Sequence, residues 1–177
     1  MNTEQQKIEY KSLQKIRTGE KGFKELSTTC VALANAQGGQ IMIGVEDKTK
    51  KPAPNQVIPQ EEANSAVTRL RGLCFNVGLA VGDVCADETG SQYFAITVFP
   101  SLHSYATTSD GKMYIRVADK CEPVRSEDIQ RVGEEKGAFQ WELVPTQFEL
   151  EDENKTNLSK FANDIRQSDR VKQHIKQ

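Results

Sequence analysis

The chain has 177 residues, and its 23 Lys and Arg against 25 Asp and Glu give a formal net charge of -2 at pH 7. This balance excludes proteins that bind nucleic acid by overall positive charge, although it permits a local basic face. The length predicts one domain with an appendage. The longest apolar runs, such as residues 41–43, are far shorter than the roughly 20 residues that span a bilayer, so we expect no membrane contact.

The cysteine pattern favours reduced thiols in the cytoplasm. Cys30, Cys74, Cys85 and Cys121 are widely spaced and form no Cys-x-x-Cys pair, which disfavours a structural zinc site. The N-terminus also lacks the apolar segment of a signal peptide. Cys30 and Cys85 lie inside apolar patterns and are expected to be small buried side chains.

The first third of the chain predicts strand, loop, helix and strand. Ile8–Leu13 is typical of a short strand, and the polar residues 14–22 with two glycines indicate a loop. From Phe23 onward, apolar residues recur every three or four positions, which predicts a helix that ends at Gly38 and Gly39. Alternation over Gln40–Asp47 predicts a strand buried on at least one face.

The following residues add a loop over 48–60, a helix over Glu61–Phe75 and an antiparallel hairpin. The hairpin strands are Leu79–Ala86 and Gln92–Phe99, separated by a turn signal at residues 87–90. Lys112–Val117 predicts a further strand, and Ser126 is a candidate N-cap of a helix. Because strands and helices do not alternate strictly, we predict an α+β fold with a mixed, largely antiparallel sheet flanked by helices.

We expect the domain to cover residues 1–136, followed by an acidic linker and a C-terminal helix over 137–177. An apolar patch at residues 139–143 is expected to pack back on the domain. The stripe of Leu158, Phe161 and Ile165 predicts a helix whose partners lie outside this sequence, so the chain is interpreted as part of a longer protein.

The sequence gives little evidence for a phosphate-binding loop or for a catalytic Ser–His or Cys–His pair. Gly111-Lys112 lacks both the upstream glycine and the following Ser or Thr of a phosphate loop. Only His103 and His174 could act in a nucleophilic relay, and both lie in polar surroundings, where a solvated side chain is the simpler interpretation.

Several motifs in the first 47 residues occur together. They are Glu9-Tyr10-Lys11, the helix that ends in Ala34-Asn35-x-x-Gly38-Gly39, and the strand Ile43-Gly44-Val45-Glu46-Asp47. With Tyr114-Ile115-Arg116-Val117 and the helix after it, they resemble the Schlafen-like AlbA_2 DNA-binding domain over residues 4–135. Ser104 departs from the proline that many relatives carry, which we interpret as loop variation.

The resemblance implies a nucleic-acid-binding domain of a transcriptional regulator, with DNA ahead of RNA as the partner. It also implies an alternative, because animal Schlafens include endoribonucleases whose acidic residues match Glu4, Glu9 and Asp47. Three carboxylates suit Mg²⁺ or Mn²⁺, which polarises a phosphate and activates water. Residues five apart point to opposite faces of a straight strand, so spacing alone does not bring Glu4 to Glu9. The simpler interpretation pairs Glu9 with a nearby lysine and places Asp47 in a turn.

Basic residues decide whether phosphate binding is plausible. Residues 1–24 are net positive, whereas residues 134–153 are strongly acidic. The candidate phosphate contacts are Lys7, Lys11, Lys15, Arg17, Arg116 and Lys120, with Arg69 and Arg71 as further candidates. We expect Asn35, Gly38 and Gly39 to shape the turn after the helix. A third possibility is a protein-interaction module that forms a homodimer through residues 139–143 or the C-terminal helix.

Overall fold

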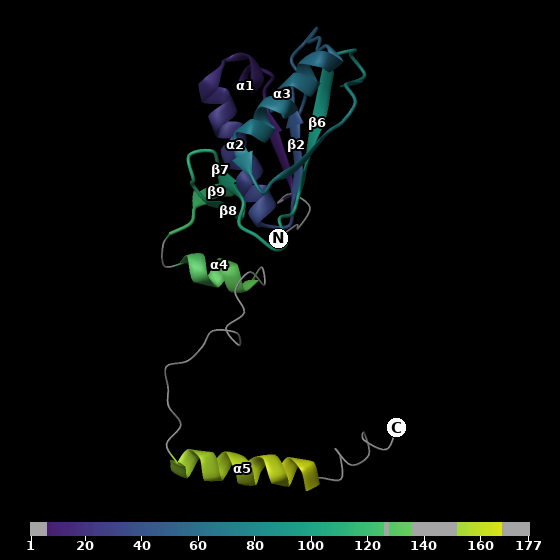
Figure 1. The fold of residues 1–177 in the computed structure, drawn as a ribbon. Helices are drawn as coiled ribbons and strands as arrows, with labels where there is room; N and C mark the ends of the chain where they lie inside the picture. Colours follow the sequence, from purple (N-terminus) through teal and green to yellow (C-terminus); the bar gives the residue numbers. More distant parts are fainter. Residues whose placement is uncertain (1–6, 126–127, 136–151, 168–177) are drawn as a thin grey trace. The chain divides into compact units, whose positions relative to one another are not determined.

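The computed structural model describes residues 7–125, 128–135 and 152–167 (Figure 1). The chain divides into two compact units, Met1–Phe139 and Gln140–Gln177, which are described separately below.

The first unit is built on a five-stranded sheet in the order β1-β2-β6-β4, with β5 also paired to β6. Its strands are β1 (Ile8–Lys11), β2 (Gly39–Ile43), β4 (Gly78–Val81), β5 (Cys85–Ala86) and β6 (Gln92–Phe99). Only the β1–β2 pair is parallel among these pairings, while β6 is antiparallel to β2, β4 and β5. Two small ribbons complete the described strands: β3 (Cys74–Phe75) with β7 (Thr107–Thr108), and β8 (Tyr114–Val117) with β9 (Lys120–Pro123). The predicted α+β fold with a largely antiparallel sheet is therefore confirmed.

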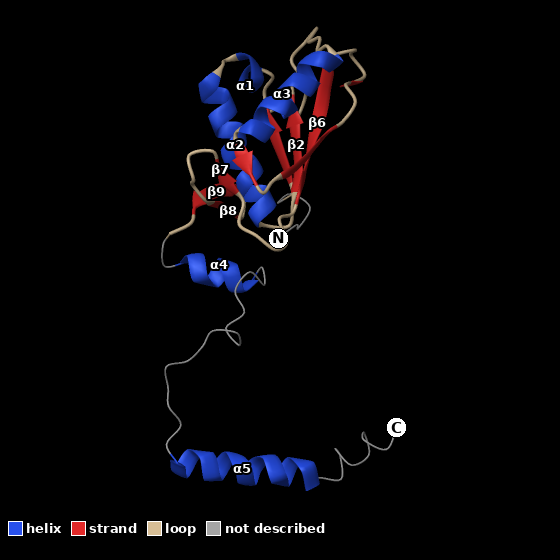
Figure 2. Ribbon diagram, in the orientation of Figure 1, coloured by secondary structure: helices blue, strands red, loops and turns tan. Residues whose placement is uncertain are grey.

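Helices cover one face of this sheet (Figure 2). They are α1 (Gln14–Arg17), α2 (Glu20–Asn35) and α3 (Gln60–Gly72), and α4 (Ile129–Glu135) follows the last ribbon. Leu26, Val31 and Leu33 of α2 join Val67 and Leu70 of α3 in one core with the sheet. Burial of these apolar side chains is the main force that holds the layers together.

Alternation along the strands divides the sheet into a covered and an open face. Ile41 and Ile43 of β2 are fully buried under the helices, as are the facing residues of β6, Phe94, Ile96 and Val98. The intervening residues point the other way, because successive side chains of a strand alternate between faces. Those residues are half-buried or exposed, including Tyr10, Met42 and Tyr93.

The loop expected over residues 14–22 is wrong, because this segment forms α1 and the first turn of α2. Gly19 separates the two helices with a φ of 77°, a conformation that glycine adopts without strain. Gly22 lies inside α2 where a Cβ would stand 2.0 Å from the carbonyl oxygen of Lys15. Both glycines therefore permit a tight helix pair, whereas two glycines in a polar segment predict a loop from the sequence alone.

Other boundaries shift by a few residues. The strand expected to reach Asp47 ends at Ile43, because Gly44 turns the chain with a φ of 91°. The helix expected to reach Phe75 ends at Gly72, and its last two residues form β3 instead. The hairpin is confirmed, with its first strand interrupted between β4 and β5. The short strands β7 and β9 were not expected.

The described part of the second unit is one helix, α5 (Asp152–Gln167). Leu158, Phe161 and Ile165 are 50%, 63% and 44% exposed, so the apolar stripe predicted from the sequence faces outward. The expected N-cap at Ser126 and the apolar patch at residues 139–143 lie outside the described residues. Among the helices that the structure describes, none combines the length and apolar character needed to cross a membrane.

Candidate nucleic-acid interface

Glu9 lies at the centre of an ion-pair network on the covered side of β1. Lys11 donates to one carboxylate oxygen (Nζ–Oε1 2.6 Å) and Arg116 donates to the other (Nη2–Oε2 2.6 Å). Glu9 therefore pairs with a nearby lysine, as the simpler interpretation of this residue expects. It also pairs with Arg116, which lies 107 residues away in the sequence. The network ties β1 to β8.

Arg116 is an interior side chain, only 6% exposed. Its second amino group donates to the Cys121 sulfur (Nη1–Sγ 3.5 Å), and its Nε is a buried atom without a hydrogen-bond partner among the described residues. Burial disfavours the charged form, but the hydrogen bonds to Cys121 and Glu9 outweigh it and raise the pKa of Arg116. As placed, this guanidinium neutralises Glu9, and a phosphate contact by Arg116 stays a prediction.

Two further candidate cations are bound to carboxylates near α1. Lys15 pairs with Glu25 of α2. Arg17 forms a bidentate pair with Glu62 of α3 (both N–O distances 2.7 Å) and donates to the Val57 carbonyl (3.1 Å). Hydrogen bonds from these cations hold the pKa values of Glu25 and Glu62 below their ordinary range. The pairs fasten α1 to α2 and to α3, so these cations have a structural role.

A second group of lysines is exposed and has no carboxylate partner among the described residues. Its members are Lys7, Lys21, Lys24, Lys48, Lys51 and Lys120. Between residues 7 and 125 the chain carries fifteen Lys and Arg against thirteen Asp and Glu, so the described domain is slightly basic. Five of these thirteen carboxylates form ion pairs: Glu9, Glu25 and Glu62 with cations of β1, α1 and β8, and Asp47 and Asp110 with lysines two or three residues away.

Asp47 lies in the turn after β2, as its simpler interpretation expects. Its side chain is 78% exposed and accepts a hydrogen bond from Lys50 (2.6 Å), which lowers the pKa of Asp47. The described residues contain no group of three His, Cys, Asp or Glu side chains that could hold a metal ion. Glu4 lies outside these residues, and Glu9 is already neutralised by two cations. The acidic residues that the structure places therefore do not fit a divalent cation in this arrangement.

Asn35 does more than shape a turn. Its side-chain amide donates to the carbonyls of Ala106 and Tyr114 (both 2.9 Å) and its oxygen accepts from the Ala106 N–H (2.9 Å). These bonds fasten the end of α2 to the chain before β7 and to β8. Asn35 is 8% exposed, so the bonds are shielded from water.

The double glycine at the end of α2 permits close backbone packing. A Cβ on Gly38 would stand 2.6 Å from the Val98 oxygen, and one on Gly39 would stand 2.4 Å from the Lys7 oxygen. Gly38 also adopts a φ of 73° and donates to the Leu33 carbonyl (2.9 Å), which ends the helix.

The cysteines are all free thiols. Cys30 is buried as expected, but Cys85 is exposed, so that expectation is wrong. Cys85 belongs to a two-residue edge strand whose two residues are both exposed, whereas the preceding Val84 packs against the core. His103 lies in an exposed loop.

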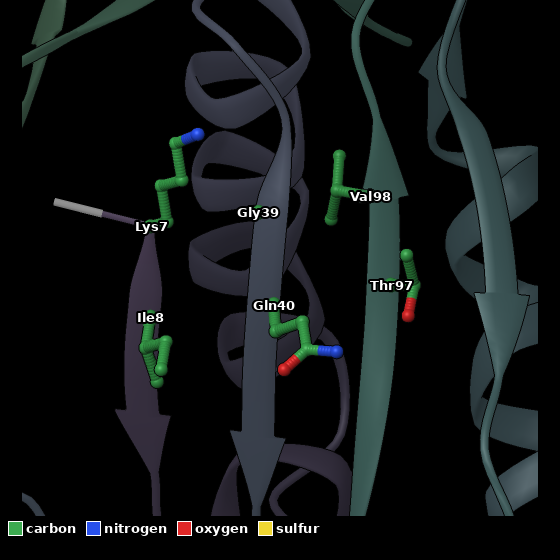
Figure 3. A pocket seen from close by; sticks show the side chains of 6 residues that line it. All are labelled: Lys7, Ile8, Gly39, Gln40, Thr97 and Val98. Atoms are coloured by element: carbon green, nitrogen blue, oxygen red, sulfur yellow. The ribbon is translucent and has the colours of Figure 1, made fainter. Parts of the chain in front are cut away.

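Sequence reasoning passed over a set of side chains on the open sheet face. Tyr10, Met42 and Tyr93 line a hollow of about 680 Å³, together with Lys50 and Lys51 of the loop after β2. A second hollow of about 470 Å³ lies on β1, β2 and β6 and is lined by Lys7, Ile8, Gly39, Gln40, Thr97 and Val98 (Figure 3). Strand alternation could have indicated this face, since Tyr93 alternates with the buried Phe94.

The model of the family described as "Schlafen, AlbA_2" matches residues 4–125. The chain belongs to this family. The match confirms the resemblance inferred from the Glu-Tyr-Lys, Asn-x-x-Gly-Gly and Tyr-x-Arg motifs. No curated protein matches the chain.

A solved structure with a similar fold is the DIP2311 protein from Corynebacterium diphtheriae, with 21% sequence identity and a TM-score of 0.50. The similarity covers 70% of this AlbA_2 chain and 26% of that chain, so the present chain spans about a quarter of the larger protein. At this identity the comparison concerns the fold alone.

Proposed function

We infer that this AlbA_2 domain binds nucleic acid, DNA ahead of RNA, as a module of a regulatory protein in the cytoplasm. The observation that carries the proposal is the set of exposed lysines without carboxylate partners in the described domain. Ammonium groups of this kind bind phosphate oxygens and release the counterions of the nucleic acid. Family membership supports the same conclusion.

The proposal divides the cations of the domain into two classes. Lys15, Arg17 and Arg116 join different elements through their carboxylate partners, and Lys11 pairs with Glu9 of its own strand. The unpaired lysines contact phosphate. Among the candidates from the sequence, Lys7 and Lys120 belong to the second class.

Fluorescence anisotropy with labelled duplex DNA, single-stranded DNA and structured RNA at several salt concentrations tests the proposal. Each phosphate contact contributes about -0.9 to the slope of log affinity against log salt for duplex DNA. The double variant Lys21→Gln/Lys24→Gln is expected to bind more weakly and with a shallower slope. Lys112→Gln is the matched control, because Lys112 is exposed but already paired with Asp110 (3.1 Å).

An affinity that does not change with salt, or no binding at low salt, would contradict the proposal. Equal losses for Lys112→Gln and for the double variant would show that the paired and unpaired lysines are equivalent, and would remove the basis of the division.

A further inference from the structure

We propose that the open face of the sheet binds unpaired nucleotides of a single strand, with bases stacked on Tyr10 and Tyr93. The inference rests on the proposed function and specifies it further: lysines elsewhere on the domain contact phosphates of any nucleic acid, whereas this face selects bases that are not paired.

The first argument is the arrangement of side chains along the strands. Ile8, Gln40 and Thr97 form one row across β1, β2 and β6, and Tyr10, Met42 and Ala95 form the next. Tyr93 lies two residues before Ala95 on the same face of β6, and Met42 lies between Tyr10 and Ala95 in their row. The open face therefore carries one aromatic ring on β1 and another on β6, with the unbranched side chain of Met42 on the strand between them.

The two hollows follow each other along the same strands. Moving two residues along β1 and β2 leads from Ile8 and Gln40 to Tyr10 and Met42, and moving four residues back along β6 leads from Thr97 to Tyr93. A binding track of this kind suits a chain of successive nucleotides better than an isolated small molecule. Sheets with exposed aromatic side chains stack two or three bases of single-stranded RNA in other folds.

Lysines stand at both ends of this track. Lys7 lines the first hollow, and Lys50 and Lys51 line the second. Ammonium groups beside a stacking surface are the combination that binds single strands, because the rings take the bases and the cations take the phosphates. The charge and the aromatic groups therefore point to the same class of ligand.

Lys50 now covers the ring that a base would use. Its ammonium lies 4.2 Å from the centroid of the Tyr10 ring, and its backbone has a φ of 54°, which side-chain-bearing residues seldom adopt. A base stacks on tyrosine more strongly than an exposed ammonium does. Lys50 is also paired with Asp47 (2.6 Å), so the phosphate beside a base stacked on Tyr10 would be contacted by the unpaired Lys51.

One acidic residue in the second hollow, Glu88, can accept a hydrogen bond from a base edge. The Asp87 carboxylate accepts from the backbone N–H groups of Thr89 and Ser91 (both 2.9 Å), so it is occupied within its own turn. Glu88 is exposed beside it and can accept a hydrogen bond from an amino group of a base. The hollow thus offers an acceptor as well as cations.

The test compares the wild-type full chain with Tyr10→Leu and Tyr93→Leu in anisotropy titrations. The probes are single-stranded DNA, single-stranded RNA and duplex DNA of equal length. Each leucine variant is expected to weaken single-strand binding about tenfold or more, within the range of one lost stacking contact, and to change duplex binding by less than about twofold. Tyr10→Phe and Tyr93→Phe keep the ring and are expected to bind like the wild type.

Tyr105→Leu is the matched control, because Tyr105 lies in the loop before β7 and bonds to Ile129 of α4 (3.0 Å). Urea unfolding of each variant shows whether it is folded, and either leucine variant that folds is sufficient for the test. Single-strand affinity that is unchanged in both leucine variants would overturn the inference while leaving the proposed function intact. Equal losses for duplex and single strands would also overturn it. A wild type that binds none of the three probes would instead remove the proposed function itself, and the inference with it.

Discussion

Replacement of Asn35 by alanine is expected to destabilise the domain strongly. The amide group makes three hydrogen bonds to backbone groups of Ala106 and Tyr114, and the side chain is 8% exposed. A hydrogen bond contributes about 0.5–1.5 kcal/mol net, and a buried group left without its partner costs about 1–3 kcal/mol. Since the three backbone partners lose their bonds together, we expect Asn35→Ala to lower the free energy of unfolding by about 2–4 kcal/mol.

The measurement is urea unfolding followed by far-ultraviolet circular dichroism, with the midpoint and the slope fitted separately. The midpoint should fall and the slope should stay constant, because the variant changes stability and not the area exposed on unfolding. Asn64→Ala is the control: Asn64 is exposed on α3, and this substitution should change stability by no more than about 0.5 kcal/mol. A loss for Asn35→Ala as small as that of the control would refute the reasoning that these bonds fasten α2 to β8.

Two further predictions concern ion pairs. Glu9→Gln should destabilise the domain by about 3–5 kcal/mol in urea unfolding, because it leaves the buried Arg116 without its counter-charge, whereas the exposed Asp47→Asn should leave stability unchanged. Unaltered stability of Glu9→Gln would favour a catalytic over a structural carboxylate. For the Arg17–Glu62 pair, the lowered pKa of Glu62 means that its contribution to stability is complete above the ordinary value of 4.5 and is lost as the pH falls below it. The stability difference between wild type and Glu62→Gln should therefore shrink on acidification, and a constant difference would show that the pair does not titrate with folding.

Much of the central sheet could be predicted from local patterns. Three patterns predict the local backbone conformation from a few neighbouring residues. They are the alternation at Ile41 and Ile43, the helical spacing from Phe23 to Leu33, and the paired glycines. Strand pairing around the Asp87 turn was equally local. These signals were strong enough to give the fold class and the family.

The remaining features depend on contacts between distant residues. Helix α1 is short and polar, and its glycine Gly22 is needed only because another helix packs against it at Lys15. Glu9 and Arg116 are 107 positions apart, and Asn35 and Ala106 are 71 positions apart. No local sequence pattern predicts either of these contacts. For the same reason the sequence pattern predicts a surface cation at Arg116, although its side chain is interior.

The central claim is that exposed, unpaired lysines of the domain contact phosphate. It is tested most directly by the affinity of the wild-type chain for labelled DNA across a series of salt concentrations. The account predicts that log affinity falls linearly with log salt concentration, with a slope that corresponds to several phosphate contacts. The slope should be shallower for Lys21→Gln/Lys24→Gln and the same as in the wild type for Lys112→Gln. A flat line, or a slope that the double variant does not alter, would contradict it.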